Sequence, residues 1–462
     1  MSVPGLVRFC GVAAGLLLLA GCALRPAGED QERRNAEEAG RAWEKQPLEA
    51  PPALPETPTL QDYLQHAFYA NADLQRAYWQ WRAALEQIPQ DSSWPNIAVP
   101  FSVMFTKESM NLWDRTTLGL TNDPMSNIPY PGKLSTAGRR ALEDARAAGA
   151  RFEEAKFLLQ GKVLSTYYDL ALLAESIRIQ EQNVDLLRAV ARQSSGRLQT
   201  GGEGQQDLLR IQTELDLAQN DLENLRSQTP PLIARFNALL GRAATEPVPL
   251  PSALPAPRAL PVPDDRLFQV AADRSPEMAA LAREVAGRKE ALDLARKAYI
   301  PDFGLSAAIT GNVSQTLGGM IVLPTRLEAI KAGVEQARAN LRAAEAARVQ
   351  YGRDLTASFV LNLYVLRNDE RQVALFEDVI VPRAQQAIKI AQSSYAAGRL
   401  SYQELLDAQR ALLSAQLATA QLRTEREKAL AAIETWSAVD VETFKPGRSA
   451  VRGARASGSG GM

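Results

Sequence analysis

The 462-residue chain has two cysteines and one histidine, and this scarcity removes most metal-binding and acid–base chemistry. Cys10 lies in an N-terminal segment that we expect to be cleaved, so Cys22 would remain alone and no internal disulfide framework is possible. His66 lies on a helical pattern, and we interpret it as an ordinary surface or packing residue. The phosphate-loop, zinc-protease and serine-hydrolase motifs are also missing, so we predict that the protein is not an enzyme.

A strong net charge and long apolar runs are missing as well. The 52 basic and 53 acidic residues give a formal net charge of −1, which leaves no electrostatic footprint for nucleic acid. After residue 22, no apolar stretch approaches the roughly 18 residues that indicate a transmembrane helix. Any part that crosses a membrane would therefore have to be a closed sheet, because lipid cannot satisfy open backbone groups.

The N-terminus carries a targeting signal. Arg8 precedes a short apolar run at residues 11–20, about half of what a spanning helix needs. Leu-Ala-Gly-Cys at residues 19–22 resembles the bacterial lipobox, in which the signal is cut just before the cysteine. We expect a signal peptide at residues 1–21 and covalent diacylglycerol and N-acyl lipid on Cys22, with no other cofactor. A free cysteine near an ordinary cleavage site is the alternative.

Sorting signals in bacterial lipoproteins depend on the residue after the lipidated cysteine. Here this residue is Ala23 and not an aspartate. By resemblance to lipoprotein sorting, alanine favours the outer membrane over retention at the inner one. We therefore expect a protein that is lipid-anchored in the cell outer membrane and extends into the periplasm.

The chain repeats one plan at a fixed offset. Tyr167 and Gly201 recur 197 residues later as Tyr364 and Gly398. Each half contains a helix ending near a proline, a short strand region, a very long helix, a glycine turn and a returning helix. Internal duplication is the simplest explanation of this shared order.

Proline density divides the sequence into segments, because closely spaced prolines disfavour both helix and central strand. Seven prolines lie between residues 247 and 263. We predict a lipid-anchored extended tether at 22–58, a first structural repeat at 59–242, a proline-rich connector at 243–263, a second repeat at 264–440 and a disordered tail at 441–462.

Two helices are predicted to exceed by far the globular average of about 10–14 residues. Residues 133–197 contain no proline and repeat apolar residues at helical spacing, which gives a rod on the order of 95 Å long. The second half repeats this design at residues 325–397, with a kink or break expected at Pro382. An ordinary coiled coil is the alternative, but the duplication and the strand segments argue against it.

Period-two alternation predicts a β-hairpin in each half, at about residues 95–130 and 301–324. Bulky apolar residues alternate with small or polar ones, as in the strands of a membrane barrel. A soluble hairpin packed on one side would alternate in the same way, and the lipidation signal favours the membrane. Four strands cannot close a barrel, which needs about eight, whereas three chains supply twelve. Trimerisation is therefore part of the prediction.

The segment from Tyr395 to Gln409, YAAGRLSYQELLDAQ, resembles the Y-x-x-G-x-x-x-x-x-[DE]-L-L-[DE]-A-[QE] turn of the TolC-like outer-membrane efflux proteins. Within that family the lipobox points to the lipidated branch, which serves drug or heavy-metal exporters. The likeness spans about residues 59–440, although Leu198 replaces the tyrosine in the first-half turn. The resemblance implies a mostly α fold with a small transmembrane β part, in which a trimer of duplicated helix–hairpin–helix chains forms a 12-stranded β-barrel and a long α-helical barrel.

The resemblance also implies that the protein is an outer-membrane channel, the exit duct of a tripartite efflux system. Such a channel passively conducts substrates that an inner-membrane pump delivers through a periplasmic adaptor. The implied partners are the homotrimer, a membrane fusion protein as adaptor, a transporter of the resistance-nodulation-division type and outer-membrane lipid, but no nucleic acid. The alternative is a lipid-anchored periplasmic coiled-coil scaffold or adaptor without a pore, which leaves the strand segments unexplained.

Three acidic residues are candidates for the pore gate. Glu404 and Asp407 are three residues apart on one helix face, directly after the second glycine turn, and match acidic positions of the family. In a trimer they would form carboxylate rings that face the pore axis, with Asp207 as the counterpart in the first half. The pattern Ser401-x-x-Glu404 also fits a helix-capping box, so a purely local role is the alternative.

The two glycine turns are the expected adaptor contacts. They comprise Gly201 and Gly202 in the first half, and Gly398, Arg399 and Ser401 in the second. Glycine at such a position ends a helix through a left-handed residue. The contact with a partner is implied by the resemblance.

Overall fold

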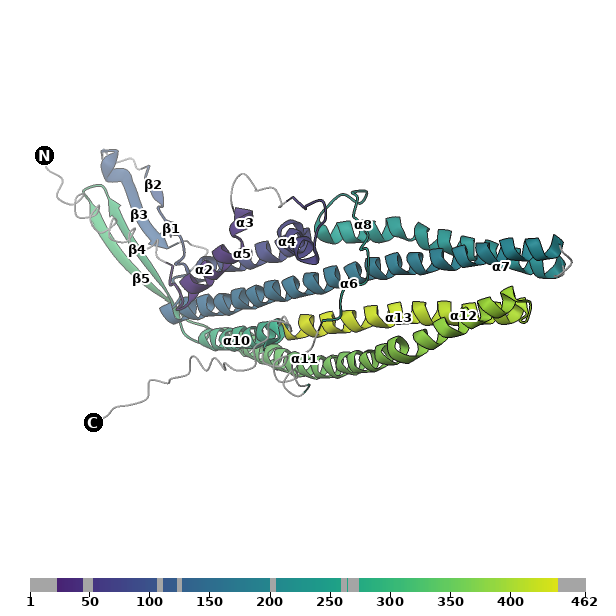
Figure 1. Cartoon of the computed structure of the whole chain (residues 1–462). Coiled ribbons are helices and arrows are strands. Elements are labelled where there is room, and N and C mark those ends of the chain that lie inside the picture. The colour runs from purple at the N-terminus through teal and green to yellow at the C-terminus, as the bar shows by residue number, and fades with distance from the viewer. Residues whose placement is uncertain are drawn as a thin grey trace. The chain divides into compact units, whose positions relative to one another are not determined.

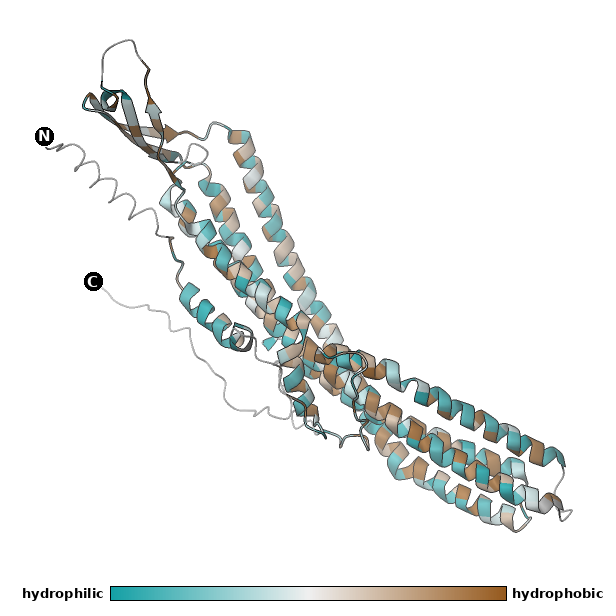
Figure 2. Cartoon of the chain, turned by 90° about the horizontal axis from the view of Figure 1, so that it is seen from above, coloured by the Kyte–Doolittle hydropathy of each residue, from teal (hydrophilic) through white to brown (hydrophobic). Residues whose placement is uncertain are grey.

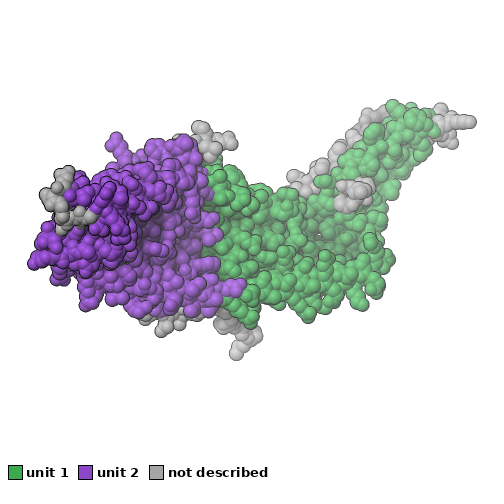
Figure 3. Space-filling view, turned by 90° about the vertical axis from the view of Figure 1, so that its right-hand side faces the viewer, with its two compact units in different colours: residues 1–50, 72–155, 276–353 green, residues 51–71, 156–275, 354–462 purple. Residues whose placement is uncertain are grey.

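The structure is a computed structural model that describes residues 23–44, 53–105, 111–122, 127–199, 205–258, 264 and 274–438. The predicted signal peptide, Cys22, Gly201, Gly202 and the predicted tail lie outside these residues. The chain divides into two compact units (Figure 3), of which unit 1 contains residues 1–50, 72–155 and 276–353, and unit 2 contains residues 51–71, 156–275 and 354–462. Each unit takes segments from both predicted repeats.

Unit 1 contains an antiparallel sheet (Figure 1), with strands β1 (Ile97–Ala98), β2 (Phe101–Val103), β3 (Thr116–Asn122), β4 (Asp302–Thr310) and β5 (Ser314–Val322). β1 and β2 pair with β3 in one register, with Ile97 opposite Asn122 and Phe101 opposite Leu118. They are one strand interrupted near Pro100, which has no N–H to donate to the ladder. The sheet therefore has four strand positions, two from each half of the chain.

The register gathers bulky apolar side chains on one face of the sheet. Directly opposite residues share a face, and Leu120, Ala307 and Leu317 lie side by side across three strands. We call this the apolar sheet face, and its members are Ile97, Phe101, Val103, Leu118, Leu120, Phe303, Leu305, Ala307, Ile309, Leu317 and Ile321. Hydropathy alternates along the strands in Figure 2, where brown segments follow paler and teal ones.

The opposite face of the sheet consists mainly of small and hydroxyl residues. We call it the small-residue sheet face, and it carries Ala98, Ser102, Thr117, Gly119, Thr121, Gly304, Ser306, Ala308, Thr310, Thr316, Gly318 and Met320. The Thr117 and Thr310 hydroxyls form a hydrogen bond of 2.9 Å on this face and join the two hairpins. The alternation predicted from the sequence is thus present across all four strand positions.

The helices of unit 1 are α2 (Glu29–Ala39), α3 (Arg41–Glu44), α5 (Ala72–Ser92), α10 (Pro276–Lys297), the first part of α6 (Pro131–Gln199) and the first part of α11 (Leu327–Leu375), with the 3-10 turn η1 (Trp113–Arg115) before β3. The α6 helix has 69 residues and includes the whole proline-free range 133–197 that predicted a long helix. No helix in the described part of the chain combines the length and the apolar composition needed to cross a membrane.

The extended tether predicted at residues 22–58 is corrected between residues 29 and 44. This segment is rich in Glu, Ala and Arg, which favour helix, and it forms α2 and α3. Trp43 is buried, with its ring centroid 5.2 Å from that of Tyr78 and 6.2 Å from that of Phe152. The aromatic contacts offset the entropy of ordering the segment, so residues 29–44 form packed helices within unit 1 rather than an extended tether.

Unit 2 contains α4 (Leu60–Ala70), α7 (Gln205–Ser227), α8 (Thr229–Leu240), η2 (Phe376–Ile380), α12 (Val381–Ala396), α13 (Tyr402–Ser437) and the remaining parts of α6 and α11. Thr59 and Asp62 form a capping box at the start of α4. The Thr59 hydroxyl and backbone N–H both donate to the Asp62 carboxylate at 2.7 Å, which lowers the pKa of Asp62. In return the Asp62 N–H donates to the Thr59 hydroxyl at 3.3 Å, which satisfies a backbone donor that the first helical turn otherwise leaves open.

The break expected at Pro382 takes the form of the π-helical turn η2. The Val381 N–H donates to the carbonyl of Phe376, five residues earlier. In a regular α-helix the proline ring would clash with the carbonyl four residues before it, and its missing N–H would leave that carbonyl open. The wider turn accommodates both effects, so the chain remains helical on either side of Pro382.

Glu154 on α6 and Glu277 on α10 form a pair of carboxyl groups in unit 1, next to Arg151. Burial, the hydrogen bond with Glu277 and the charge of Glu277 raise the pKa of Glu154 to about 7. A carboxyl group whose pKa is raised on folding stabilises the fold below its unfolded pKa, and this contribution is lost as the pH rises through the folded value.

We therefore expect stability to fall as the pH rises from about 5 to 8, and Glu154→Gln to flatten this slope, because an amide does not ionise. Thermal unfolding of the detergent-solubilised protein at several pH values measures both. Glu335→Gln, which removes an exposed glutamate of α11 in the same unit, should leave the slope unchanged. An unaltered slope in Glu154→Gln would contradict the assignment.

Candidate functional site

Four helix ends pack around one apolar core in unit 2, which we call the tip core. It joins the ends of α6 and α12 to the beginnings of α7 and α13. Its buried members are Val184, Leu187, Val190, Ile211, Ala218, Leu222, Ile388, Ala391, Tyr395, Tyr402, Leu405 and Leu406. In Figure 1 the start of α7 and the turn from α12 to α13 lie at the same end of unit 2. The tip core therefore supports the second glycine turn and the acidic residues after it.

Gly398 ends α12 in the left-handed conformation, with φ of +70°. Its N–H donates to the Tyr395 carbonyl at 2.9 Å, and the Arg399 N–H donates to the Ser394 carbonyl at 2.9 Å. These bonds satisfy carbonyls that the helix end leaves open, and a side chain at this φ would be strained. The local role expected for Gly398 is present, whereas an adaptor contact by Gly398, Arg399 or Ser401 stays a prediction.

Ser401 and Glu404 form a capping box at the start of α13. The Ser401 hydroxyl and backbone N–H donate to the Glu404 carboxylate at 2.7 and 3.0 Å. The hydroxyl bond and the backbone bond lower the pKa of Glu404, so this carboxylate is charged at neutral pH. The local role of Glu404 is confirmed, and it leaves the charge exposed. A pore role of the same carboxylate remains a prediction.

Glu404 and Asp407 lie on one exposed face of α13, while Leu405 and Leu406 between them are buried in the tip core. Asp407 accepts a weak hydrogen bond from Gln403 at 3.4 Å. Asp207 is half-buried in the first turn of α7, and so belongs to a different helix. The structure thus brings two of the three predicted gate residues onto one surface.

Two polar contacts between the halves of the chain could not be predicted from the sequence. Gln409 on α13 donates to Asn183 on α6, and Arg410 pairs with Glu214 on α7. The paired residues are separated by 226 and 196 positions, so no local spacing marks them. They connect α13, which carries Glu404 and Asp407, to the helices α6 and α7 of the first half.

The acidic residues of this site do not form a set for binding metal. In the described ranges, no group of three or more His, Cys, Asp or Glu is placed to hold a metal ion. What the site offers is exposed negative charge on a helix that packs on an apolar core. Such an arrangement attracts cations and repels anions through its electrostatic field, without coordinating them.

A family model described as "Outer membrane efflux protein" matches residues 63–242 and 267–438, about three quarters of the chain. The chain belongs to the outer membrane efflux protein family. Membership confirms the recognition made from the second glycine turn, and it makes the protein an outer-membrane efflux channel that serves as an exit duct. It also favours the channel over the scaffold without a pore.

One relative and several solved structures are similar to this efflux protein. The cobalt-zinc-cadmium resistance protein CzcC of Cupriavidus metallidurans (strain ATCC 43123 / DSM 2839 / NBRC 102507 / CH34) is 22% identical over 316 residues, which cover 64% of this chain and 72% of CzcC. The outer-membrane channel OprN superposes with a TM-score of 0.72 at 20% identity, covering 83% of this chain and 90% of OprN. CusC gives a TM-score of 0.70 at 16% identity, covering 82% and 91%.

A third structure, the outer membrane protein VceC of Vibrio cholerae, has a TM-score of 0.70 at 17% identity and covers 82% of this chain and 95% of VceC. These likenesses confirm the fold class, mostly α with a small β part. The positions of the gate, the adaptor contacts and the lipid stay predictions.

Proposed function

We propose that this efflux channel works as a homotrimer anchored by lipid on Cys22. It takes substrate from a periplasmic adaptor and an inner-membrane transporter of the resistance-nodulation-division type. The observation that carries the proposal is the apolar sheet face. Phe101 is 75% exposed and Leu317 is 85% exposed on it. So many exposed apolar side chains on one face call for lipid, and the small-residue face is then left for the water-filled interior.

The edges of the sheet support the trimer. In the described chain β5 pairs with β4, and β1 and β2 pair with β3, so each outer strand has one edge without a neighbouring strand. Open edges are not stable in lipid, because their N–H and C=O groups find no water there. Pairing β5 of one copy with β1 and β2 of the next removes every edge once three copies close a twelve-stranded ring.

Exposed apolar residues on the helices of unit 2 support the same assembly. On α11, Val360, Leu361 and Tyr364 are 58%, 61% and 67% exposed, and on α7 Leu209 and Leu217 are 56% and 54% exposed. Large apolar side chains gathered on a helix face indicate a protein partner. Neighbouring copies supply that partner if the helices form one long barrel.

The exposed carboxylates of Glu404 and Asp407 give the duct a preference for cations at its tip. Divalent metal ions, as named for the relative CzcC, are one class of substrate that such a tip admits. We place the adaptor contacts at the two glycine turns, residues 201–202 and 398–401, because these end the helix hairpins. The pump, and not the duct, selects among substrates.

The protein purified in detergent from outer membranes tests this proposal. We expect a trimer by light scattering, with measurable conductance in planar bilayers and acyl chains on the N-terminal peptide by mass spectrometry. Cys22→Ser is the control for the lipid and should lose the acyl chains. A water-soluble monomer, or a trimer without conductance, would favour the scaffold instead.

A further inference from the structure

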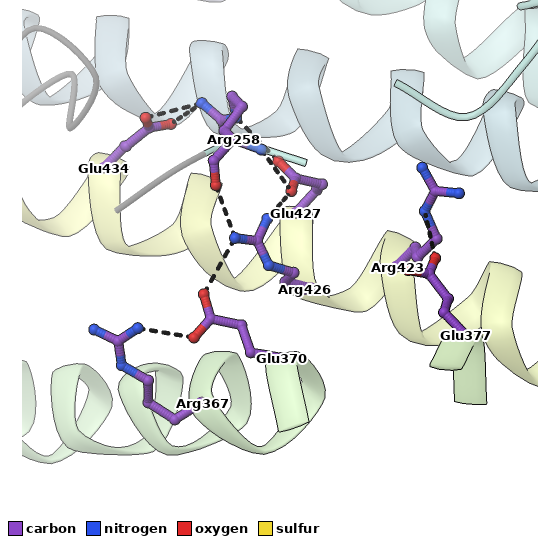
Figure 4. Close-up of polar contacts among 8 residues, drawn as sticks. All are labelled: Arg258, Arg367, Glu370, Glu377, Arg423, Arg426, Glu427 and Glu434. Carbon is purple, nitrogen blue, oxygen red and sulfur yellow. Dashed lines mark hydrogen bonds and ion pairs between the residues drawn. The ribbon is translucent and has the colours of Figure 1, made fainter. Parts of the chain in front are cut away.

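The proline-rich connector is fastened to α13 through one arginine (Figure 4). Arg258 Nε donates to Glu427 at 3.0 Å, and its Nη1 donates to both carboxylate oxygens of Glu434 at 2.9 and 3.0 Å. Its backbone N–H donates to Glu427 at 3.2 Å, and its carbonyl accepts from Arg426 at 2.7 Å. The side chain and the backbone of Arg258 are therefore both bonded to one helix.

The charged groups of Arg258, Glu427 and Glu434 are largely buried. The side chains of Glu427 and Glu434 are 5% and 2% exposed, and that of Arg258 is 18% exposed. Leu430 and Ile433, between the two glutamates, are fully buried. A buried ion pair separates reluctantly, because each partner would be left as an unpaired charge in a medium of low dielectric constant.

The same network reaches α11. Arg426 donates to Glu370 at 3.1 Å, and Glu370 accepts from Arg367 at 2.8 Å. We call this set the α13 anchor network, and it consists of Arg258, Arg367, Glu370, Arg426, Glu427 and Glu434. Arg367 also donates to Asp264 at 2.5 Å, so the three arginines of the network meet one carboxylate more than their own number. The network ties the connector, α11 and α13 together near the C-terminal end of α13.

The other end of α13 is held differently. There the ion pair of Arg410 with Glu214 has side chains that are 52% and 27% exposed. Exposed pairs contribute little, because water screens them and the side chains lose entropy. The hydrogen bond from Gln409 to Asn183 and the apolar packing of the tip core, which is not directional, provide the remaining attachment. Between the two ends, Arg423 lies 3.6 Å from Glu377 of the π-helical turn η2 (Figure 4), a kind of turn that often marks functional sites.

We propose that the α13 anchor network is the fixed end of α13, about which the tip that carries Glu404 and Asp407 moves when the duct opens. The inference rests on the proposed function, in which these carboxylates lie at the cation-selective tip of the duct. Arg258 is a positioning residue, because it acts through α13 and not on the substrate. Loss of the anchor should let the tip move away from the pore axis more often.

The test compares Arg258→Gln with the double variant Arg258→Gln/Glu434→Gln. The single variant leaves the Glu434 charge buried and unpaired, whereas the double variant removes both charges and should recover much of the melting temperature. We expect the leak conductance of both in planar bilayers to exceed that of the wild type at least about fivefold, the lower end of common coupling between sites. A double variant with the leak of the wild type would overturn the proposal, because the leak of the single variant would then reflect an unpaired charge.

Arg226→Gln is the matched control. It removes an arginine of α7 that pairs with Glu181 and Glu223 at the surface, and its leak should equal that of the wild type. An equal rise in this control would also overturn the proposal, since any lost arginine would then suffice. Failure of the wild type to conduct at all would count against the proposed function and not against the anchor.

Hydrogen exchange on the wild type gives a measurement that does not depend on folding of a variant or on conduction. We expect the backbone amides of residues 424–437 to exchange at least about tenfold more slowly than those of residues 402–412, because local opening should concentrate at the tip. Slower exchange at the tip than at the anchor would overturn the proposal.

Discussion

Leu305→Arg should abolish insertion of the protein into the outer membrane. Leu305 lies in the middle of β4 on the apolar sheet face, where its side chain is 55% exposed. An arginine on the lipid side of a barrel strand costs about 2–4 kcal/mol at the membrane midplane, and an assembled trimer would carry this cost in every copy. Separation of outer-membrane and periplasmic fractions, followed by detection of the trimer, measures the loss.

Ser306→Arg is the matched control for this prediction. Ser306 is the next residue of β4, faces the opposite side of the sheet and stands opposite Thr121 and Gly318. An arginine there would project into the water-filled interior, so insertion should be close to that of the wild type. If both variants inserted equally, or if only Ser306→Arg failed, the assignment of the two faces would be wrong.

The sheet was predictable because strand alternation depends on local geometry. Successive side chains of a strand point to opposite faces, so the period of two in residues 97–105 and 303–310 already indicates which residues share a face. The order of the hairpins needed the structure. The pairing of β3 with β4 joins residues such as Thr117 and Thr310, which are far apart in the sequence.

The long helices and caps were also readable locally. The capping boxes at Thr59 and Ser401 depend on residues three positions apart, and both are present. Pro382 marked an irregularity, but the sequence did not distinguish a π-helical turn from a break, because that depends on whether packing keeps the helix together afterwards.

Contacts between distant segments were not predictable. Arg258 meets Glu434 across 176 residues, and no spacing rule links a proline-rich connector to a helix near the C-terminus. One signal did exist, since Glu427 and Glu434 are seven residues apart and so fall on the same face as the buried Leu430. Acidic residues on a buried helix face require partners, but the sequence does not say which basic residue supplies them.

The combined variant Glu404→Gln/Asp407→Asn should reduce the preference of the duct for cations over anions about thirtyfold at 0.15 M salt. A carboxylate about 8 Å from an ion on the axis contributes about 0.5 kcal/mol in water, and screening over one Debye length leaves roughly a third. Two carboxylates in each of three copies then favour a monovalent cation by about 1 kcal/mol and disfavour a monovalent anion by as much, a difference of about 2 kcal/mol. Reversal potentials across a salt gradient in planar bilayers measure this preference.

The two substitutions separate charge from structure. Glutamine at position 404 still accepts from Ser401 in the capping box, and asparagine at 407 keeps the oxygen that Gln403 contacts. Ser401→Ala provides the converse, since it removes the cap and leaves both charges in place, and it should keep the cation preference. Glu223→Gln removes an exposed acidic residue of α7 and should leave both the cap and the cation preference unchanged.

The loss of cation preference in the combined variant must also shrink at 1 M salt, where the Debye length is about 3 Å. A preference that is unchanged in the combined variant, or a loss that persists at high salt, would remove Glu404 and Asp407 from the pore axis and leave them as residues of the helix start alone.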